Sequence, residues 1–207
     1  MENNQKTFCI KNSYRHRGIY KYFDDSNMKD EWQLEVYLHA QQMMKDNQFK
    51  SVLDVGCGSA YKLIKYLGQY DTLGIEVSPM YEWLFEKYPD RRWMKSDFNT
   101  PEKFSADLVI CADVIEHLQD PDQLLEFINR IDCKYIILST PSRDLLYHFW
   151  NRGYWGPPKN EHHIREWSAG EFRQYVSQNF NVVLHTITNR EQTTQMVVCR
   201  KKSSPRL

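Results

Sequence analysis

The sequence predicts an α/β fold in three layers, with helices on both faces of a mostly parallel seven-stranded sheet. Short apolar runs typical of buried strands alternate with helical segments between residues 51 and 139, and such alternation builds parallel strand–helix–strand units. Two further apolar runs, 182–187 and 194–199, follow each other closely. Their short separation predicts an antiparallel C-terminal hairpin at the end of the sheet.

The size and charge of the chain limit what it can do. Its 207 residues suit one compact domain with a short extension. Its 27 Lys and Arg residues balance 27 Asp and Glu residues, so the formal net charge is zero. A protein that grips long nucleic acid usually carries a basic excess. The composition therefore argues against nucleic acid as a partner and favours a small-molecule substrate, and it leaves the oligomeric state open.

The cysteine content and the hydropathy of the sequence indicate in which cellular compartment the protein is expected. The five cysteines are scattered and odd in number, a pattern that fits free thiols in a reducing environment. The first residues, MENNQKTFCI, lack the apolar core of a signal peptide. No run of about 18 apolar residues exists for a membrane span. We expect a cytoplasmic protein without a membrane span.

The chain divides into an N-terminal extension and a main domain, and the boundary lies before the first predicted strand. Residues 1–30 are polar and aromatic without a regular period, and we interpret them as an N-terminal extension or lid. Residues 31–207 then form the main domain. Apolar side chains at roughly helical spacing predict that this domain begins with an amphipathic helix over 31–48.

Five short apolar runs predict the parallel strands, and three segments between them predict helices. The strands are 51–55, 72–76, 92–94, 107–111 and 135–139, and the helices are 61–70, 79–88 and 121–131. Pro79 suits the first turn of the second of these helices. Because ligands of open α/β sheets bind at the carboxyl ends of the strands, we expect the functional site at that edge.

A long connection, residues 141–167, follows the fifth strand and is rich in Trp, Tyr, Gly, Pro and His. Long connections in compact domains are usually functional, so we expect this one to form a lid together with the N-terminal extension. A helix over 168–178 comes next. Ser168 is its predicted N-cap, and Glu171 completes a capping box.

The strongest functional motif is VLDVGCGSA at 52–60. A strand here turns sharply into a helix, and glycines allow a ligand to approach the backbone closely. In a dinucleotide enzyme this surface would hold a pyrophosphate. Asp54, immediately before the turn, suits a cationic ligand better, and S-adenosylmethionine carries an ammonium and a sulfonium group.

Two more acids follow later strands. Glu76 closes the second strand, where an acid can accept hydrogen bonds from both ribose hydroxyls. Asp97 follows the third strand, where it could accept from the adenine amino group, with Phe98 near the ring. Each feature alone is weak, since a strand-end acid is often merely solvated. Their order, spacing and common edge favour one shared site.

These motifs resemble those of class I S-adenosylmethionine-dependent methyltransferases over residues about 50 to 200. The matching segments are VLDVGCGSA (52–60), GIEVSP (74–79), SDFNTP (96–101) and DLVICADVIEHLQDP (107–121). The resemblance implies a Rossmann-like fold, S-adenosylmethionine as the cofactor and methyl transfer as the activity. Ala60 departs from the pattern, because many relatives have a third glycine there.

The resemblance also implies which residues contact the cofactor. They are Asp54, Gly56, Cys57 and Gly58 at the methionine and ribose portion, Glu76 at the ribose with Val77 beside it, Asp97 and Phe98 at the adenine, and Ala112 and Asp113 beside the methionine moiety.

The reacting end needs a group that aligns the acceptor and takes its proton. On a helical turn, Asp113, Glu116 and His117 would share one face. Adjacent His162 and His163 in the connection are further candidates, because histidine titrates near neutrality. We prefer His163 as the catalytic base, supported by Glu116 and His117. The alternative is that Glu116 and His117 only orient the backbone.

The connection also offers substrate-binding candidates. His162 could donate a hydrogen bond and Arg165 could clamp an anion, although Arg165 and Glu166 could instead dock the loop through ion pairs. STPSRDL (139–145), GPPKNEHHIREWSAGEF (156–172) and TTQMVV (193–198) resemble methyltransferases found alongside glycosyltransferases in surface-polysaccharide pathways.

That second resemblance implies a sugar, nucleotide-sugar or glycan-precursor hydroxyl as the acceptor. Four aromatic residues suit this acceptor, because aromatic faces pack against sugar rings; they are Tyr147, Trp150, Tyr154 and Trp155. Alternatively, they form a small core under the loop.

Two other functions compete with this one. Asp113, Glu116, His117 and His163 also resemble the metal-binding pattern of small-RNA 3′-terminal 2′-O-methyltransferases, in which a divalent cation would lower the acceptor's pKa. The Asp113 side chain is shorter than the Glu of that pattern, so we expect no metal. A non-catalytic S-adenosylmethionine-binding protein is the third hypothesis, and it would predict a broken cofactor motif.

Overall fold

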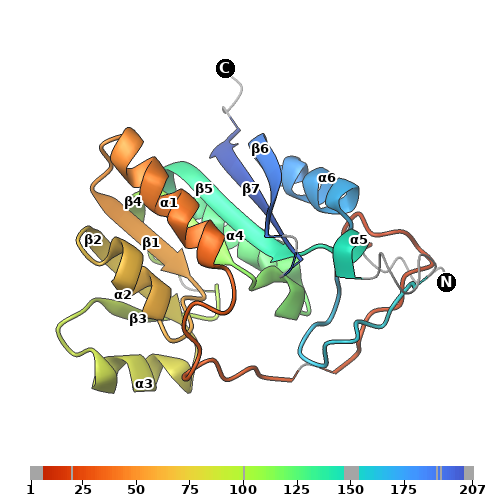
Figure 1. Cartoon of the computed structure of the whole chain (residues 1–207), viewed down its shortest axis with the longest axis horizontal. Coiled ribbons are helices and arrows are strands. Elements are labelled where there is room, and N and C mark those ends of the chain that lie inside the picture. Colours follow the sequence, from red (N-terminus) through yellow and green to blue (C-terminus); the bar gives the residue numbers. More distant parts are fainter. Residues whose placement is uncertain are drawn as a thin grey trace.

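A seven-stranded sheet with the order β3-β2-β1-β4-β5-β7-β6 forms the middle of the molecule (Figure 1). β1 to β5 pair in parallel, and β7 pairs antiparallel with both β5 and β6. The strands are β1 (Ser51–Val55), β2 (Asp71–Glu76), β3 (Trp93–Lys95), β4 (Ser105–Ala112), β5 (Asp132–Pro141), β6 (Phe180–Asn189) and β7 (Thr194–Lys201). The predicted fold class is confirmed.

The computed structural model describes residues 7–19, 21–99, 101–146, 154–189, 191 and 193–202. Its helices are α1 (Leu34–Asp46), α2 (Tyr61–Leu67), α3 (Met80–Lys87), the 3₁₀ turn η1 (Ile115–His117), α4 (Pro121–Arg130), α5 (Arg143–Leu146) and α6 (Ala169–Asn179). In the part of the chain so described, no helix is long and apolar enough to cross a membrane.

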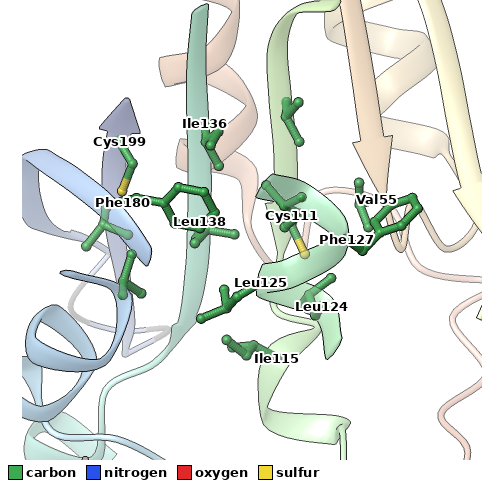
Figure 2. Packing of buried hydrophobic residues seen from close by; sticks show 14 of the residues in the cluster. Val55, Cys111, Ile115, Leu124, Leu125, Phe127, Ile136, Leu138, Phe180 and Cys199 are labelled. Atoms are coloured by element: carbon green, nitrogen blue, oxygen red, sulfur yellow. The ribbon is translucent and has the colours of Figure 1, made fainter. Parts of the chain in front are cut away.

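Two hydrophobic cores lie on the two faces of the sheet. One contains buried residues of α1, α2 and α3, and the other contains those of α4 and α6. In Figure 2, Leu124, Leu125 and Phe127 of α4 lie against the side chains of β4 and β5, such as Cys111 and Leu138. This packing fixes the sheet between two helix layers.

The observed elements differ from the predicted ones mainly at their ends. β4 and β5 extend beyond their apolar runs, because backbone pairing continues through polar residues such as Ser105 opposite Asp132. The predicted capping box is present: Ser168 N donates to Glu171 Oε2 (2.9 Å) and Glu171 N donates to Ser168 Oγ (3.3 Å). The short α5 lies within the connection that was predicted to be irregular.

Two segments far apart in sequence lie side by side near the carboxyl ends of the parallel strands (Figure 1). They are the N-terminal segment, residues 7–19 and 21–33, and the part of the connection described here, residues 154–167. Arg15 N donates to Trp155 O (2.7 Å), and Arg17 N donates to Ile164 O (2.8 Å). We call this pair of segments the lid.

Candidate active site

The turn after β1 begins with two residues in unusual conformations. Gly56 has φ 71° and Gly58 has φ 53°, values in the left-handed region that favours glycine. A Cβ on Gly56 would lie 2.5 Å from Val114 Cγ2. Gly56 is therefore needed for packing within the fold as well as for an approaching ligand. Ala60 also adopts the left-handed region (φ 53°), which accounts for the third glycine that relatives have there.

Asp54 is a fully buried carboxyl group beside this turn. Tyr37 of α1 donates a hydrogen bond from its hydroxyl to Asp54 Oδ2 (2.8 Å). Asp54 Oδ1 has no hydrogen-bond partner among the described residues. Burial raises the pKa of Asp54 to about 7. A buried oxygen without a partner is costly, so this site fits a ligand that brings a cation or a hydrogen-bond donor, as S-adenosylmethionine does.

Glu76 lies at the other side of the glycine turn. Gly58 N donates to Glu76 Oε2 and Val77 N donates to Glu76 Oε1, both at 2.8 Å. Burial raises the pKa of Glu76 to about 7. The structure thus brings Glu76, Val77 and the turn together, in keeping with a site for the cofactor, while the ribose contact stays a prediction.

The third predicted acid has different surroundings. Asp97 is exposed, and its Oδ1 accepts from Asn99 N (3.2 Å), a bond that lowers the pKa of Asp97. Phe98 is buried and its ring packs against Phe127 with 5.6 Å between centroids. Phe98 therefore belongs to the core in this structure, and the adenine contact of both residues stays a prediction.

The end of β4 brings Ala112 and Asp113 to the same edge. Ala112 is buried, and Asp113 has φ 53°. Ser139 of β5 donates its hydroxyl to Asp113 Oδ1 (2.6 Å). Burial raises the pKa of Asp113 and, even more, that of the Cys57 thiol. Cys57 is thus a buried thiol whose environment disfavours the thiolate.

Glu116, His117 and His163 come together next to Asp113. Each offers one atom, and these atoms all lie within 4.8 Å of one another. Glu116 Oε2 accepts from Thr140 Oγ1 (3.0 Å), whereas Glu116 Oε1 is buried without a hydrogen-bond partner among the described residues. Burial, and then the nearby Asp113, hold the pKa of Glu116 well above its usual range.

The position of His117 fixes its tautomer. His117 Nδ1 lies 2.9 Å from His162 O, and because a carbonyl only accepts, Nδ1 carries the hydrogen. His117 Nε2 then presents its lone pair, 3.9 Å from Glu116 Oε1. Burial lowers the pKa of His117 to about 4. The ring is neutral at physiological pH.

Two hydrogen-bond partners hold the His163 ring and fix its tautomer. Its Nδ1 lies 2.9 Å from Glu166 Oε1 and its Nε2 lies 2.9 Å from Asn160 Nδ2. A carboxylate accepts and an amide nitrogen donates, so Nδ1 carries the hydrogen and Nε2 the lone pair. Asn160 gave no signal in the sequence, because its contact depends on the turn that joins it to His163.

The predicted substrate-binding residues Arg165 and His162 both have hydrogen-bond partners within the protein. Arg165 donates to Leu118 O (2.6 Å) and Gln119 O (2.8 Å), and its role as an anion clamp stays a prediction. His162 Nδ1 lies 3.2 Å from Lys21 O, and its ring packs against Phe23.

The predicted sugar-binding aromatics pack within the lid. Trp155 lies next to Lys11 and Arg143, each 5.2 Å from the centroid of its ring. Tyr154 donates its hydroxyl to Pro157 O. Tyr147 and Trp150 lie outside the described residues.

Sequence reasoning missed a residue of the N-terminal segment that reaches the glycine turn. Ser59 N donates to Asp25 Oδ2 (2.9 Å), and a Cβ on Gly58 would overlap that carboxylate. The sequence indicated only a polar and aromatic extension or lid here, without a motif that singles out Asp25. The path of the chain, rather than any motif, brings Asp25 to the site.

Comparisons with known proteins agree with this geometry. Residues 25–185 match a family described as methyltransferase domain, and no curated protein matches the chain. The methyltransferase domain of bacterial CtHen1 has 24% identity and a TM-score of 0.63, covering 81% of this chain and 98% of that one.

Two further solved structures share the fold. Magnesium protoporphyrin IX methyltransferase from Synechocystis PCC 6803, solved with bound SAH, has 15% identity and a TM-score of 0.64, covering 81% of this chain and 83% of that one. The small RNA methyltransferase HEN1 has 20% identity and a TM-score of 0.61, covering 90% of this chain and 27% of that one.

Proposed function

The chain belongs to the methyltransferase domain family, and from this premise we propose that it O-methylates a hydroxyl group on a sugar, a nucleotide-sugar or another small polar acceptor. S-adenosylmethionine is the methyl donor of this enzyme. When bound, it supplies a methyl group on a positively charged sulfur. Asp54, Glu76 and the turn from Gly56 to Gly58 would hold it.

The pair formed by His163 and Glu166 is the observation that carries this proposal. Glu166 orients the imidazole through Nδ1 and leaves Nε2 as a base, the arrangement that general-base catalysis needs. An acceptor hydroxyl would replace the Asn160 amide as the donor to Nε2. The hydroxyl proton then passes to Nε2 as the new C–O bond forms and the C–S bond breaks.

The surroundings of this pair support a small, polar acceptor. His163 is buried within the lid (7% exposed), and a covered site keeps water away from a reactive methyl donor. The zero net charge supports a small acceptor over a long polyanion.

The first test replaces the proposed base and its partner. We expect His163→Ala to lower kcat for nucleotide-sugar acceptors about 100- to 10,000-fold, and Glu166→Gln to lower it less, because only the orientation of the ring suffers. The Kd for S-adenosylmethionine, measured by calorimetry, should stay within about twofold. His39→Ala, on α1, is the matched control. A kcat of His163→Ala within a few-fold of the parent would contradict the proposal.

A second candidate function is metal-assisted methylation of a terminal ribose in RNA. The unpartnered Glu116 Oε1 beside the lone pairs of His117 and His163 favours it, because one carboxylate and two imidazoles are suitable ligands for a divalent cation. Such a cation would lower the pKa of the acceptor hydroxyl. One of the solved structures with this fold is named as a small RNA methyltransferase.

Chelation separates the two candidates. If the RNA candidate holds, dialysis against a chelator abolishes methylation of RNA with free 3′ ends and a divalent ion restores it. If the sugar candidate holds, turnover of a nucleotide-sugar persists after chelation and RNA is not methylated. His117→Ala should weaken binding of Mn²⁺, followed by calorimetry, only in the first case.

A further inference from the structure

We propose that Asp25 is a donor-binding residue, an N-terminal carboxylate that lies against the glycine turn and holds the cationic methionine end of S-adenosylmethionine together with Asp54, beside the Glu76 that is predicted to bind the ribose. The sequence motifs supply the other two acids, whereas Asp25 belongs to the lid. It adds to the donor site a carboxylate that no sequence motif indicated.

The first argument is the position of the carboxylate. Asp25 Oδ2 accepts from Ser59 N at 2.9 Å, at the start of the turn that leads into α2. The space that a side chain on Gly58 would fill contains the Asp25 carboxylate. The absence of a side chain on Gly58 therefore leaves room for the Asp25 carboxylate, which lies directly against the backbone of the glycine turn.

The second argument is charge. The charge of Asp25 raises the pKa of Glu76, in addition to the larger effect of burial, and Glu76 in turn raises the pKa of Asp54. Asp25 and Asp54 thus each lie close enough to Glu76 for their charges to repel. Lys62 opposes this repulsion at Asp25 and Asp54. A cationic ligand would relieve the remaining repulsion and gain from all three charges.

The third argument is the way the strap, residues 25–30, is attached. Met28 N donates to Asp25 O (2.8 Å) and Lys62 Nζ donates to Lys29 O (2.8 Å). Asp30 pairs with Lys65 and accepts from the Tyr66 hydroxyl. Because these cations and the tyrosine belong to α2, which begins at the glycine turn, the strap holds Asp25 in register with the turn.

The proposal predicts a difference between donor and product. S-adenosylmethionine carries a sulfonium and an ammonium charge, whereas S-adenosylhomocysteine has lost the sulfonium charge. Removing one carboxylate charge should therefore weaken the donor more than the product. An acid in the lid would thus help to retain the donor and to release the product.

The test measures the Kd of both compounds by calorimetry for Asp25→Asn and for Asp25→Ser, which keeps a hydroxyl that can accept from Ser59 N. We expect both variants to bind S-adenosylmethionine about tenfold more weakly and S-adenosylhomocysteine at most about threefold more weakly, with an unchanged Tm. Asp24→Asn is the matched control and should bind both compounds as the parent does, because Asp24 is exposed and caps Ser26 N.

Three results would overturn the proposal. Unchanged affinity for both compounds would mean that Asp25 does not contact the donor. Tighter binding of both would mean that its carboxylate occupies the donor's place and has to leave. An equal loss for both compounds, with a lower Tm, would mean that Asp25 only stabilises the strap.

Discussion

Asp54 and Glu76 are buried carboxyl groups, and their raised pKa values should make the stability of the protein depend on pH. Burial raises the pKa of each carboxyl group to about 7, above the values expected in an unfolded chain. The folded state therefore holds protons that the unfolded state has lost between about pH 5 and 7. Stability from these groups is present below pH 4 and is lost as the pH rises through about 7.

Donor binding should have the opposite pH dependence. A cationic donor prefers the ionised carboxylates, so its affinity should increase between pH 6 and pH 8 by roughly tenfold for each of the two carboxyl groups that has to ionise. Differential scanning calorimetry would show a larger rise of Tm with S-adenosylmethionine at pH 8 than at pH 6. Asp54→Asn should reduce this difference, because one of the two groups no longer titrates. An equal rise at both pH values would contradict the assignment.

Single residues also show where sequence reasoning stopped. The positions of Asp54 and Glu76 at strand ends followed from the motifs, because a strand that turns into a helix places its last residues at the edge. Their partners did not follow. The Tyr37 hydroxyl on Asp54 depends on how α1 packs on the sheet. Two interpretations of Arg165 were open, an anion clamp or docking of the loop, and the sequence contained no sign that its donors reach the backbone carbonyls of Leu118 and Gln119.

At the scale of elements, α6 shows how a local motif gains a long-range role. The capping box of Ser168 and Glu171 was readable from the sequence because its two bonds join residues three positions apart. Glu171 also forms an ion pair with the buried Arg143 (2.5 Å) and accepts from Lys11 N (3.2 Å). It therefore links α6 to α5 and to the N-terminal segment.

Substitutions at the start of α6 should separate these roles. Ser168→Ala should lower the free energy of unfolding by about 1 kcal/mol, the usual effect of losing a cap. Glu171→Ala should lower it by about 3 kcal/mol, because Arg143 is left buried without its partner.

Urea denaturation would measure both changes. Gly170→Ala is the control: a Cβ there meets nothing within 4 Å, so it should raise stability by about 0.5–1 kcal/mol. Equal losses for Ser168→Ala and Glu171→Ala would mean that the contact with Arg143 adds nothing.

At the scale of the whole molecule, the lid joins the two ends of the site. Arg17 donates from Nε to His163 O (3.2 Å) and from its second guanidinium nitrogen to Pro158 O. These bonds tie the N-terminal segment to the residue that we propose as the base. Closure over the donor and placement of His163 should therefore depend on each other.

Loss of the Arg17 side chain should affect the acceptor more than the donor. We expect Arg17→Ala to raise the KM for the acceptor and lower kcat, together about 10- to 100-fold in kcat/KM, with the Kd for S-adenosylmethionine within about twofold. Steady-state kinetics and calorimetry would measure these values. Arg15→Ala is the control, because Arg15 contacts the connection through its backbone N–H. A tenfold weaker donor affinity in Arg17→Ala would contradict this division of roles.

The sequence by itself determined the order of strands and helices, the glycine turn, the strand-end acids and the cap of α6. These features depend on periodicity, backbone conformation and hydrogen bonds between near neighbours. Only the tertiary structure decided that Asp25 reaches Gly58 and that His117 bonds a carbonyl 45 residues away. Such contacts depend on the path of the chain between distant elements, which local patterns do not encode.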